Sequence, residues 1–251
     1  MSRQPFSVVI ITRNAASQLG ACLESASFAD EIVVVDSGST DGTAELAAKH
    51  GARVLQKEWL GFGAQKQFAV AAARHDWVLC LDADERVSEA LRANVLAVLA
   101  APAAHAYAMP RRNRFMGRWL GHGEGYPDWS LRLFDRRHAH WSDDPVHEQV
   151  VSSAPVARIK GDLLHDSAET LAGYLDKQNR YTTLAARHAL ARGEHAGPAK
   201  LLLSPLLRFI KFYVFRLGFL DGVPGLIHIL IGCQNSFAKY AKMLVFQAGK
   251  Q

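Results

Sequence analysis

The segment DWVLCLDADE, residues 76–85, joins a continuous apolar run to a cluster of carboxylates. The run at 77–81 shows no alternation of polar and apolar residues, which is typical of a strand covered on both faces of a sheet. Asp82 and Asp84 follow it one residue apart, and Glu85 comes next. Because like charges this close repel one another, an uncompensated cluster costs stability. We therefore expect a positive charge at this strand end.

The first hundred residues alternate strand and helix patterns. Apolar runs predict strands at 7–12, 31–36, 52–58 and 76–82, and the segments 14–26, 39–51, 61–74 and 88–101 predict helices. Such an alternation of strands and helices is typical of an α/β fold with a mainly parallel sheet. The glycine pattern at 61–63 lacks a third glycine and follows the third strand, which excludes a dinucleotide-binding fingerprint.

Polar residues follow three of these predicted strands. Ligands bind an open α/β sheet beyond the carboxyl ends of its strands. The residues expected to converge there are Thr12, Arg13 and Asn14, then Asp36 and Gly38, then Asp82 and Asp84. Residues i and i+2 of an extended chain project to the same side, so the last two carboxylates can reach one Mg²⁺ or Mn²⁺ ion. The alternatives are an ordinary turn at Asp36 and an acidic helix start at Asp84.

Composition narrows the class of protein. Of 251 residues, 49% are hydrophobic and 21% are charged, as in globular proteins, which argues against disorder. The net charge of +5 suits an anionic partner. Three cysteines that lie far apart in the sequence argue against a disulfide framework and against a zinc site. They are typical of a protein of the reducing cytosol. The apolar run at 6–12 is too short for a signal sequence.

Beyond residue 101 the pattern changes. The stretch 107–150 is rich in Arg, Trp, His and Gly, with short strands predicted at 130–135 and near 145–151. Its arginines and aromatic residues suit either a solvated face or a surface that stacks a sugar and binds a phosphorylated acceptor. No nucleic-acid-binding motif accompanies them. His138 and His140 lack a third ligand at a compatible spacing, so we leave them out of the site.

The C-terminal stretch, 199–247, is helical in pattern and very apolar. Cations interrupt it repeatedly, and its only acid is Asp221. Its longest uncharged segment, 222–238, has 17 residues and falls short of the roughly 20 needed for a membrane span. Cations spaced along apolar helices are typical of an element lying on anionic lipid. The alternative is a helical pair that packs on the catalytic domain or forms a dimer interface.

Four motifs carry a family resemblance. SVVIITRN, EIVVVDSGSTDGT, GFGAQKQFAV and DWVLCLDADE resemble, in order and spacing, those of family 2 glycosyltransferases. These are inverting enzymes that use nucleotide-sugar donors, and the resemblance implies a GT-A fold with a Rossmann-like sheet and a helical extension. The later YPDWSLRLFDRR and PVHEQV resemble more narrowly the bacterial lipopolysaccharide inner-core β-1,4-glucosyltransferases, which transfer glucose to heptose.

The resemblance implies roles for individual residues. Asp36 would bind uracil or ribose, Asp82 the ribose or diphosphate, and Asp84 the metal. The expected donor-binding set is Thr12, Arg13, Asn14, Asp36, Gly38, Lys66 and Asp82. An inverting displacement needs a base for the acceptor hydroxyl. We expect Glu148 in this role, with Asp128 in reserve, and Trp129, Arg132 and His147 on the acceptor side.

These expectations define one hypothesis. Residues 1–165 would form the catalytic domain, with a donor half at about 1–101 and an acceptor half at about 102–165, and 166–251 a membrane-associating extension. The enzyme would move glucose from UDP-glucose onto a lipid-linked saccharide, an inner-core heptose, at the cytoplasmic face of the inner membrane. Its partners would be the donor, this acceptor and an anionic membrane surface, without nucleic acid. The alternatives are transfer to a polyprenyl phosphate or another surface polysaccharide, and a catalytically inactive membrane scaffold.

Overall fold

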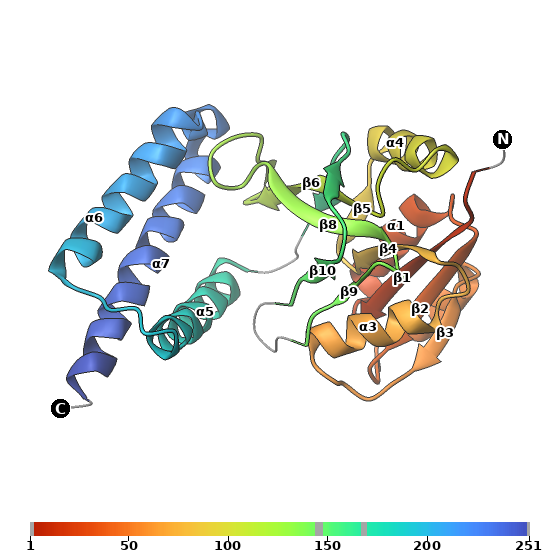
Figure 1. The fold of residues 1–251 in the computed structure, drawn as a ribbon, viewed down its shortest axis with the longest axis horizontal. Helices are drawn as coiled ribbons and strands as arrows, with labels where there is room; N and C mark the ends of the chain where they lie inside the picture. Colours follow the sequence, from red (N-terminus) through yellow and green to blue (C-terminus); the bar gives the residue numbers. More distant parts are fainter. Residues whose placement is uncertain (1–2, 144–147, 167–169, 250–251) are drawn as a thin grey trace. The chain divides into compact units, whose positions relative to one another are not determined.

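A computed structural model describes residues 3–143, 148–166 and 170–249 (Figure 1). The chain forms two compact units. The first holds Met1–Arg111 and Trp129–Asp166, and the second holds Arg112–Asp128 and Ser167–Gln251.

The central sheet has the strand order β3-β2-β1-β4-β8-β6-β12-β5, with β7 and β11 also pairing β6. β1 pairs in parallel with β2 and β4, and β2 pairs in parallel with β3. The pairs β4–β8 and β12–β5 are antiparallel, and β9 and β10 form a separate antiparallel pair. The strands are β1 (Phe6–Thr12), β2 (Glu31–Asp36), β3 (Arg53–Gln56), β4 (Trp77–Asp82), β5 (Glu85–Val87), β6 (Ala106–Phe115), β7 (Arg118–Trp119), β8 (Asp128–Asp135), β9 (Ala139–Trp141), β10 (Val150–Ser152), β11 (Val156–Arg158) and β12 (Leu163–His165).

Helices cover both faces of the parallel half. α1 (Ala16–Ala26), α2 (Thr43–Lys49) and α4 (Glu89–Ala100) share one hydrophobic core with the sheet, and α3 (Phe62–Ala72) shares the other with β9. Alternate side chains of a strand point to opposite faces. Val8 of β1 therefore lies in the first core and Val9 in the second. Each such side chain stabilises the fold by about 1.5–3 kcal/mol on burial. The predicted α/β fold with a mainly parallel sheet is confirmed.

Several strands lie outside the predicted ones, namely β5, β6, β7, β9, β11 and β12. β6 begins one residue before the Arg- and Trp-rich stretch, and β5 occupies the three residues before the cap of α4. Ser88 caps α4 by accepting a hydrogen bond from the Leu91 amide. The helix predicted from residue 14 begins instead at Ala16, so Asn14 does not cap it, and the carboxylate of Asp41 accepts from the Ala16 amide at 3.1 Å. A loop from another part of the chain thus performs the capping.

The second unit is helical. Its elements are α5 (Leu171–Ala191), α6 (Pro198–Phe209), the π-helical η1 (Ile210–Phe215), the 3₁₀-helical η2 (Gly218–Asp221) and α7 (Gly222–Ala248). α7 packs against α5 and α6. The segment 112–128 is tied to these helices by Asp221, whose buried carboxylate accepts hydrogen bonds from the Gly121 and His122 amides.

Within the described residues, none of the helices alone is both long and apolar enough to span a membrane. Pro198–Phe215 and Gly218–Ala248 meet that criterion only as a pair, and the pair is bent by 74°.

Candidate active site

The carboxyl ends of β1, β2 and β4 meet at one edge of the sheet. Thr12 lies opposite Asp36 in the β1–β2 register, and Ile11 lies opposite Asp82 in the β1–β4 register. Neighbouring strands are about 4.8 Å apart. The structure therefore brings together the three polar strand ends that the sequence predicted.

Two cations of the protein balance the charge of Asp82. Its Oδ1 lies 3.0 Å from Lys66 Nζ, and its Oδ2 lies 2.7 Å from Arg132 Nη2. Burial by itself would raise the pKa of Asp82, but Arg132 and Lys66 outweigh this effect and hold the pKa well below its usual range. The positive charge expected at this strand end is thus supplied, in the first place, by the chain itself.

Arg132 joins Asp82 to a second carboxylate. Its Nη2 lies 2.7 Å from Oε1 of Glu85, whose side chain is fully buried, and Arg132 itself is only 5% exposed. Glu85 also accepts a hydrogen bond from the Asp82 amide at 3.0 Å. Arg132, which we expected on the acceptor side, is thus buried between two carboxylates and neutralises charge at the end of β4.

Lys66 connects Asp82 to Glu148. Its Nζ lies 3.6 Å from Oε1 of Glu148, and it sits 4.6 Å from the centre of the Trp141 ring. The Lys66 side chain is nearly buried, whereas Glu148 is partly open to solvent. Glu148, the residue expected as base, and Asp82, at the acidic strand end, therefore contact the same lysine.

Two other predicted residues lie outside this geometry. His147 is outside the described residues. Asp128 begins β8 but belongs to the second unit, so the structure does not test it as a base.

Asp84 pairs with a histidine that the sequence analysis missed. Its Oδ2 lies 3.3 Å from Nε2 of His165, at the end of β12. The Asp166 amide donates to the Asp84 carbonyl at 3.1 Å, which fixes the two segments together. Burial tends to raise the pKa of Asp84, but the hydrogen bond and charge of His165 lower it overall. No local motif marks His165, because β12 reaches this place only through its pairing with β5.

Asp84 and His165 are chemically suited to a divalent ion. Carboxylate oxygen and imidazole nitrogen are common ligands of Mn²⁺ and related ions. Two ligands about 2.1 Å from one ion, in neighbouring positions, lie roughly 3.0–3.4 Å apart. The 3.3 Å between their ligand atoms falls in that range.

Asp36 closes its own turn. Its Oδ2 accepts hydrogen bonds from the Gly38 amide at 3.1 Å and the Ser39 amide at 2.9 Å, and its Oδ1 accepts from the Ser39 hydroxyl. Gly38 has a φ of +81°, which this turn requires and which favours glycine. The carboxylate is therefore fixed in place by its own turn.

The loop after β1 is tied to the loop after β2. The backbone amide of Asn14 donates to Ser39 Oγ at 2.8 Å, and the side-chain Oδ1 of Asn14 accepts from the Thr40 backbone amide at 2.8 Å. Arg13 is exposed beside this link. Thr12 Oγ1 is buried and has no hydrogen-bond partner within the described residues. Because such a group is costly to leave unpaired, it is suited to a bound ligand.

Trp129, expected on the acceptor side, is an exposed residue of β8 in the first unit. The Arg158 guanidinium lies 4.5 Å from the centre of its ring, so one face of the indole is already covered by a cation.

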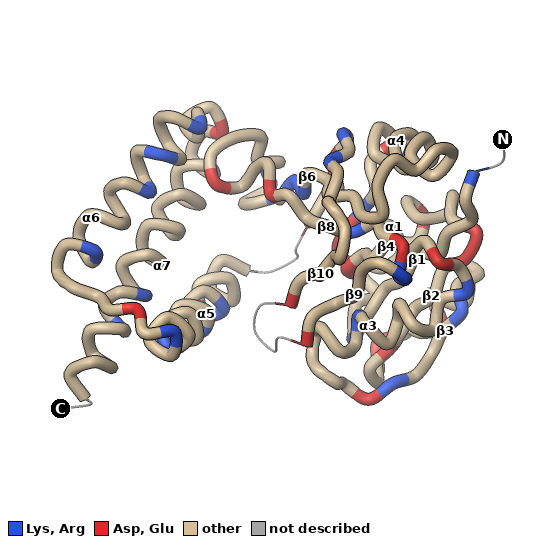
Figure 2. Tube along the Cα trace, in the orientation of Figure 1, with Lys and Arg blue, Asp and Glu red and all other residues tan. Residues whose placement is uncertain are grey.

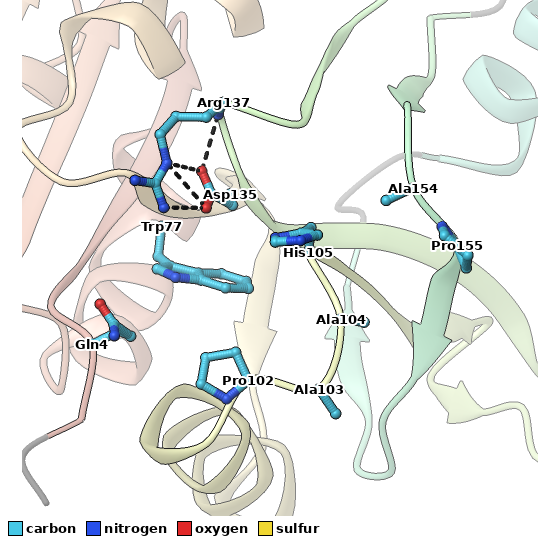
Figure 3. A pocket seen from close by; sticks show the side chains of 10 residues that line it. All are labelled: Gln4, Trp77, Pro102, Ala103, Ala104, His105, Asp135, Arg137, Ala154 and Pro155. Carbon is cyan, nitrogen blue, oxygen red and sulfur yellow. Dashed lines mark hydrogen bonds and ion pairs between the residues drawn. The ribbon is translucent and has the colours of Figure 1, made fainter.

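The opposite edge of the same sheet contains a hollow of 360 Å³ (Figure 3). It lies at the start of β4, beside Trp77, and includes His105, Asp135 and Arg137. β4 carries Trp77 and Asp82 at its two ends, about 17 Å apart at 3.3 Å per residue. This hollow is therefore separate from the acidic edge.

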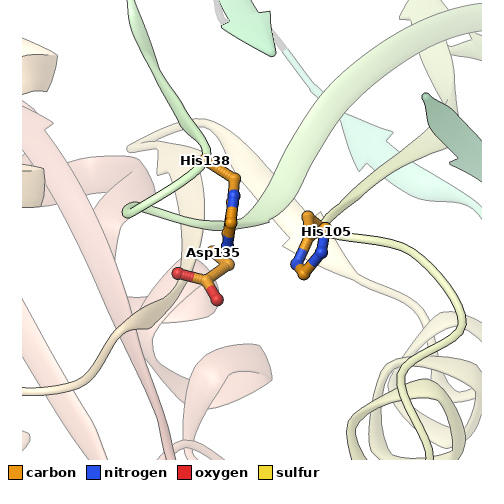
Figure 4. Close-up of side chains that lie close together, drawn as sticks. All are labelled: His105, Asp135 and His138. Carbon is orange, nitrogen blue, oxygen red and sulfur yellow. The ribbon is translucent and has the colours of Figure 1, made fainter. Parts of the chain in front are cut away.

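His105, Asp135 and His138 lie together beside that hollow (Figure 4). Their potential ligand atoms are within 4.8 Å of one another, and in the described part of the chain they are the one group of three such residues. The histidine rings stack at 3.9 Å, and Arg137 donates to both oxygens of Asp135. A cation already neutralises this carboxylate, so we do not assign the donor metal here. His140 is not part of this group.

Comparisons with known proteins cover most of the chain. The family model described as Glycosyl transferase family 2 matches residues 7–158. The lipopolysaccharide core biosynthesis glycosyltransferase LpsC of Rhizobium meliloti (strain 1021) is 33% identical over 248 residues, which cover 95% of this chain and 92% of that protein.

Two solved structures are similar in fold. The mannosyltransferase PcManGT from Pyrobaculum calidifontis, in complex with GDP-Man and Mn²⁺, has a TM-score of 0.54 at 18% identity, covering 100% of this chain and 77% of that one. Glucosyl-3-phosphoglycerate synthase from Mycobacterium tuberculosis, in complex with Mn²⁺, UDP and glucosyl-3-phosphoglycerate, has a TM-score of 0.50 at 17% identity, covering 76% and 81%.

Replacing Arg132 tests whether its positive charge stabilises the end of β4. We expect Arg132→Met to lower the free energy of unfolding by about 3 kcal/mol at pH 7, because it removes the guanidinium that the buried Glu85 shares with Asp82 and leaves them only Arg111 and Lys66. The loss should shrink towards pH 4, because Asp82, whose pKa Arg132 holds low in the unchanged protein, then takes up a proton more readily. Urea unfolding at both pH values measures this.

Arg192→Met is the matched control, because Arg192 pairs with Glu194 at an exposed position. It should change stability little at either pH. Equal effects of the two substitutions would contradict the role of Arg132.

Proposed function

The chain belongs to glycosyltransferase family 2, and we propose that it is an inverting enzyme that moves glucose from UDP-glucose onto a heptose of the lipopolysaccharide inner core. A glycosyltransferase with a GT-A fold is the shared basis of this proposal. The observation that carries it is the meeting of Asp82, Asp84, Lys66 and Glu148 at the carboxyl edge of a parallel sheet. Its similarity to LpsC supports the choice of a lipopolysaccharide core acceptor.

The donor nucleotide would bind over the ends of β1 and β2. Thr12 Oγ1 offers an unpaired hydroxyl, and Asp36 offers a carboxylate held rigidly by its turn. Arg13 is exposed beside them and can contact the diphosphate. Asn14 and Gly38 would act by shaping the two linked loops.

Asp84 and His165 would hold Mg²⁺ or Mn²⁺. When bound, such an ion neutralises the charge of a departing nucleoside diphosphate. Lys66 would add a fixed positive charge on the same side, since its ammonium lies 3.0 Å from Asp82. Asp82, balanced by two cations, would then orient Lys66 and the ribose rather than add net negative charge beside the diphosphate.

Glu148 would act as the base. As the acceptor hydroxyl oxygen bonds to the anomeric carbon, a Glu148 carboxylate oxygen takes its proton, and the bond to the diphosphate breaks with both electrons leaving on the diphosphate. This displacement needs no covalent intermediate and inverts the anomeric configuration. Solvent exposure of Glu148 beside the nearly buried Lys66 suits a group that must meet an incoming acceptor.

The alternatives differ in acceptor or in activity. A polyprenyl phosphate or another surface polysaccharide would use the same donor edge. A catalytically inactive membrane scaffold would not need Asp84 and His165 within ligand distance of each other, so their pairing favours an active enzyme.

The second unit would bind the cytoplasmic face of the inner membrane as a peripheral element. Its helices expose many large apolar side chains, of which Phe215 is 78% exposed. The others between the start of α6 and the start of α7 are Leu202, Leu203, Leu206, Leu207, Val214, Leu217, Phe219, Leu220 and Val223. Figure 2 shows several cations along α6 and α7, and the one acid in 199–247, Asp221, is buried. Apolar side chains among cations match an anionic lipid surface.

The donor and its metal can be tested without knowing the acceptor. We expect UDP-glucose with Mn²⁺ to raise the melting temperature, and EDTA or the substitutions Asp84→Asn and His165→Ala to remove the metal-dependent part of the shift. A panel of nucleotide sugars in thermal-shift and donor-hydrolysis assays measures this. His138→Ala, in the group at the opposite edge, should keep the full shift. A shift that His138→Ala abolishes and Asp84→Asn preserves would move the metal to that group.

The base is tested by an isosteric change. Glu148→Gln should lower kcat by about 10²–10⁴-fold, because the amide cannot accept the proton, while the Kd for UDP-glucose and the melting temperature stay unchanged. Asp128→Asn is the control and should keep the rate. The reverse result would reassign the base to Asp128.

Membrane binding is tested with one substitution. Phe215→Glu should strongly reduce co-sedimentation with phosphatidylglycerol vesicles, because it places a charge on the most exposed apolar side chain. Val151→Glu introduces the same charge at an exposed apolar position of the first unit and should bind vesicles as the unchanged protein does. Wild-type binding to neutral phosphatidylcholine vesicles should be weak. Equal binding by both variants would refute the lipid contact.

A further inference from the structure

The turn between β3 and α3 presents a small aromatic surface. Trp59 is 45% exposed and Phe62 is 52% exposed, and their ring centroids lie 4.8 Å apart at an interplanar angle of 87°. Leu60 between them is 47% exposed. Single exposed apolar residues are ordinary, but a contiguous group with two aromatic rings is typical of a contact surface.

The turn that carries these rings is fixed. Gln65 is fully buried, and its Oε1 accepts a hydrogen bond from the Leu60 amide at 3.3 Å. Its Nε2 donates to Ser37 Oγ at 3.0 Å and to the Lys57 carbonyl at 3.4 Å. One buried amide thus holds both sides of the turn. A ligand that stacks on the rings would therefore not have to order the loop first.

The helix that begins at Phe62 contacts the proposed base. Phe62 and Lys66 are four residues apart on α3 and so share one face of the helix. Lys66 contacts Asp82 and Glu148. Between them, a Cβ at Gly63 would collide with the Ser142 carbonyl and lie 3.4 Å from the Cβ of Glu148. The first turn of α3, which begins at Phe62, therefore packs against Ser142 and Glu148.

We propose that Trp59 and Phe62 bind the acceptor saccharide by stacking against the apolar face of one of its sugar rings, next to Glu148. A pyranose presents a C–H face that packs on an aromatic ring, while its hydroxyls stay free for hydrogen bonds. Glu148 and Lys66, which the same first turns of α3 bring together, are hydrogen-bonding groups for those hydroxyls. A lipid chain on the rings would instead remove water from this charged pair without offering it a partner, which is unfavourable. This inference rests on the function proposed above.

Separate substitutions of Trp59 and Phe62 test whether their rings bind the acceptor. The assay follows labelled glucose from UDP-glucose into membranes of cells from which this gene is deleted, with membrane concentration varied. We expect Trp59→Ala and Phe62→Ala each to raise the membrane concentration needed for half-maximal rate by about tenfold. The KM for UDP-glucose should stay the same. Trp59→Phe and Phe62→Tyr keep a flat ring and should recover most of the loss.

Leu60→Ala is the matched control, because it removes a similarly exposed apolar side chain from the same turn without removing a ring. It should leave the acceptor dependence unchanged. An equal effect of Leu60→Ala, with a parallel loss of vesicle binding, would identify a lipid contact and overturn the proposal. An unchanged acceptor dependence in both ring variants would also overturn it. Failure of the unchanged enzyme to hydrolyse or transfer any nucleotide sugar would refute the proposed function instead.

Discussion

The structure of the first unit depends on the balance of charge at the end of β4. Asp82 and the fully buried Glu85 share the guanidinium of Arg132, and Lys66 adds a second cation to Asp82. Removing one partner of such a buried group leaves its charge less well balanced, which costs more than a surface ion pair is worth. This network also fixes α3, β4, β5 and β8 relative to one another, since each contributes one of the four residues.

The same charge balance gives Asp82 and Asp84 different surroundings. Asp82 already has a cation on each oxygen, whereas Asp84 has a histidine at 3.3 Å and lies farther along the turn. In a metal-dependent glycosyltransferase, the first carboxylate would then organise the protein side of the site and the second would face the ion. Two nearby acids with identical chemistry would thus differ in role because their surroundings differ.

The second unit has a different physical character. Its core is small, built around Ala186, Ala189 and Met243, while many leucines and phenylalanines remain exposed. A soluble helical unit of this size ordinarily buries such residues. Together with the exposed cations, this distribution is what leads us to propose a lipid surface as its partner, at the place where a lipid-linked acceptor would be met.

The sequence by itself determined the parallel half of the sheet and the positions of its polar strand ends. Continuous apolar runs and their flanking polar residues are local patterns, and Asp36, Asp82 and Asp84 could be located from them. It did not reveal β5, the burial of Arg132 or the part played by His165. These depend on pairings between segments 50 to 80 residues apart, such as Arg132 with Asp82 and β12 with β5. Only the folded chain brings such distant residues within hydrogen-bonding range, because no local periodicity encodes which strand lies beside which.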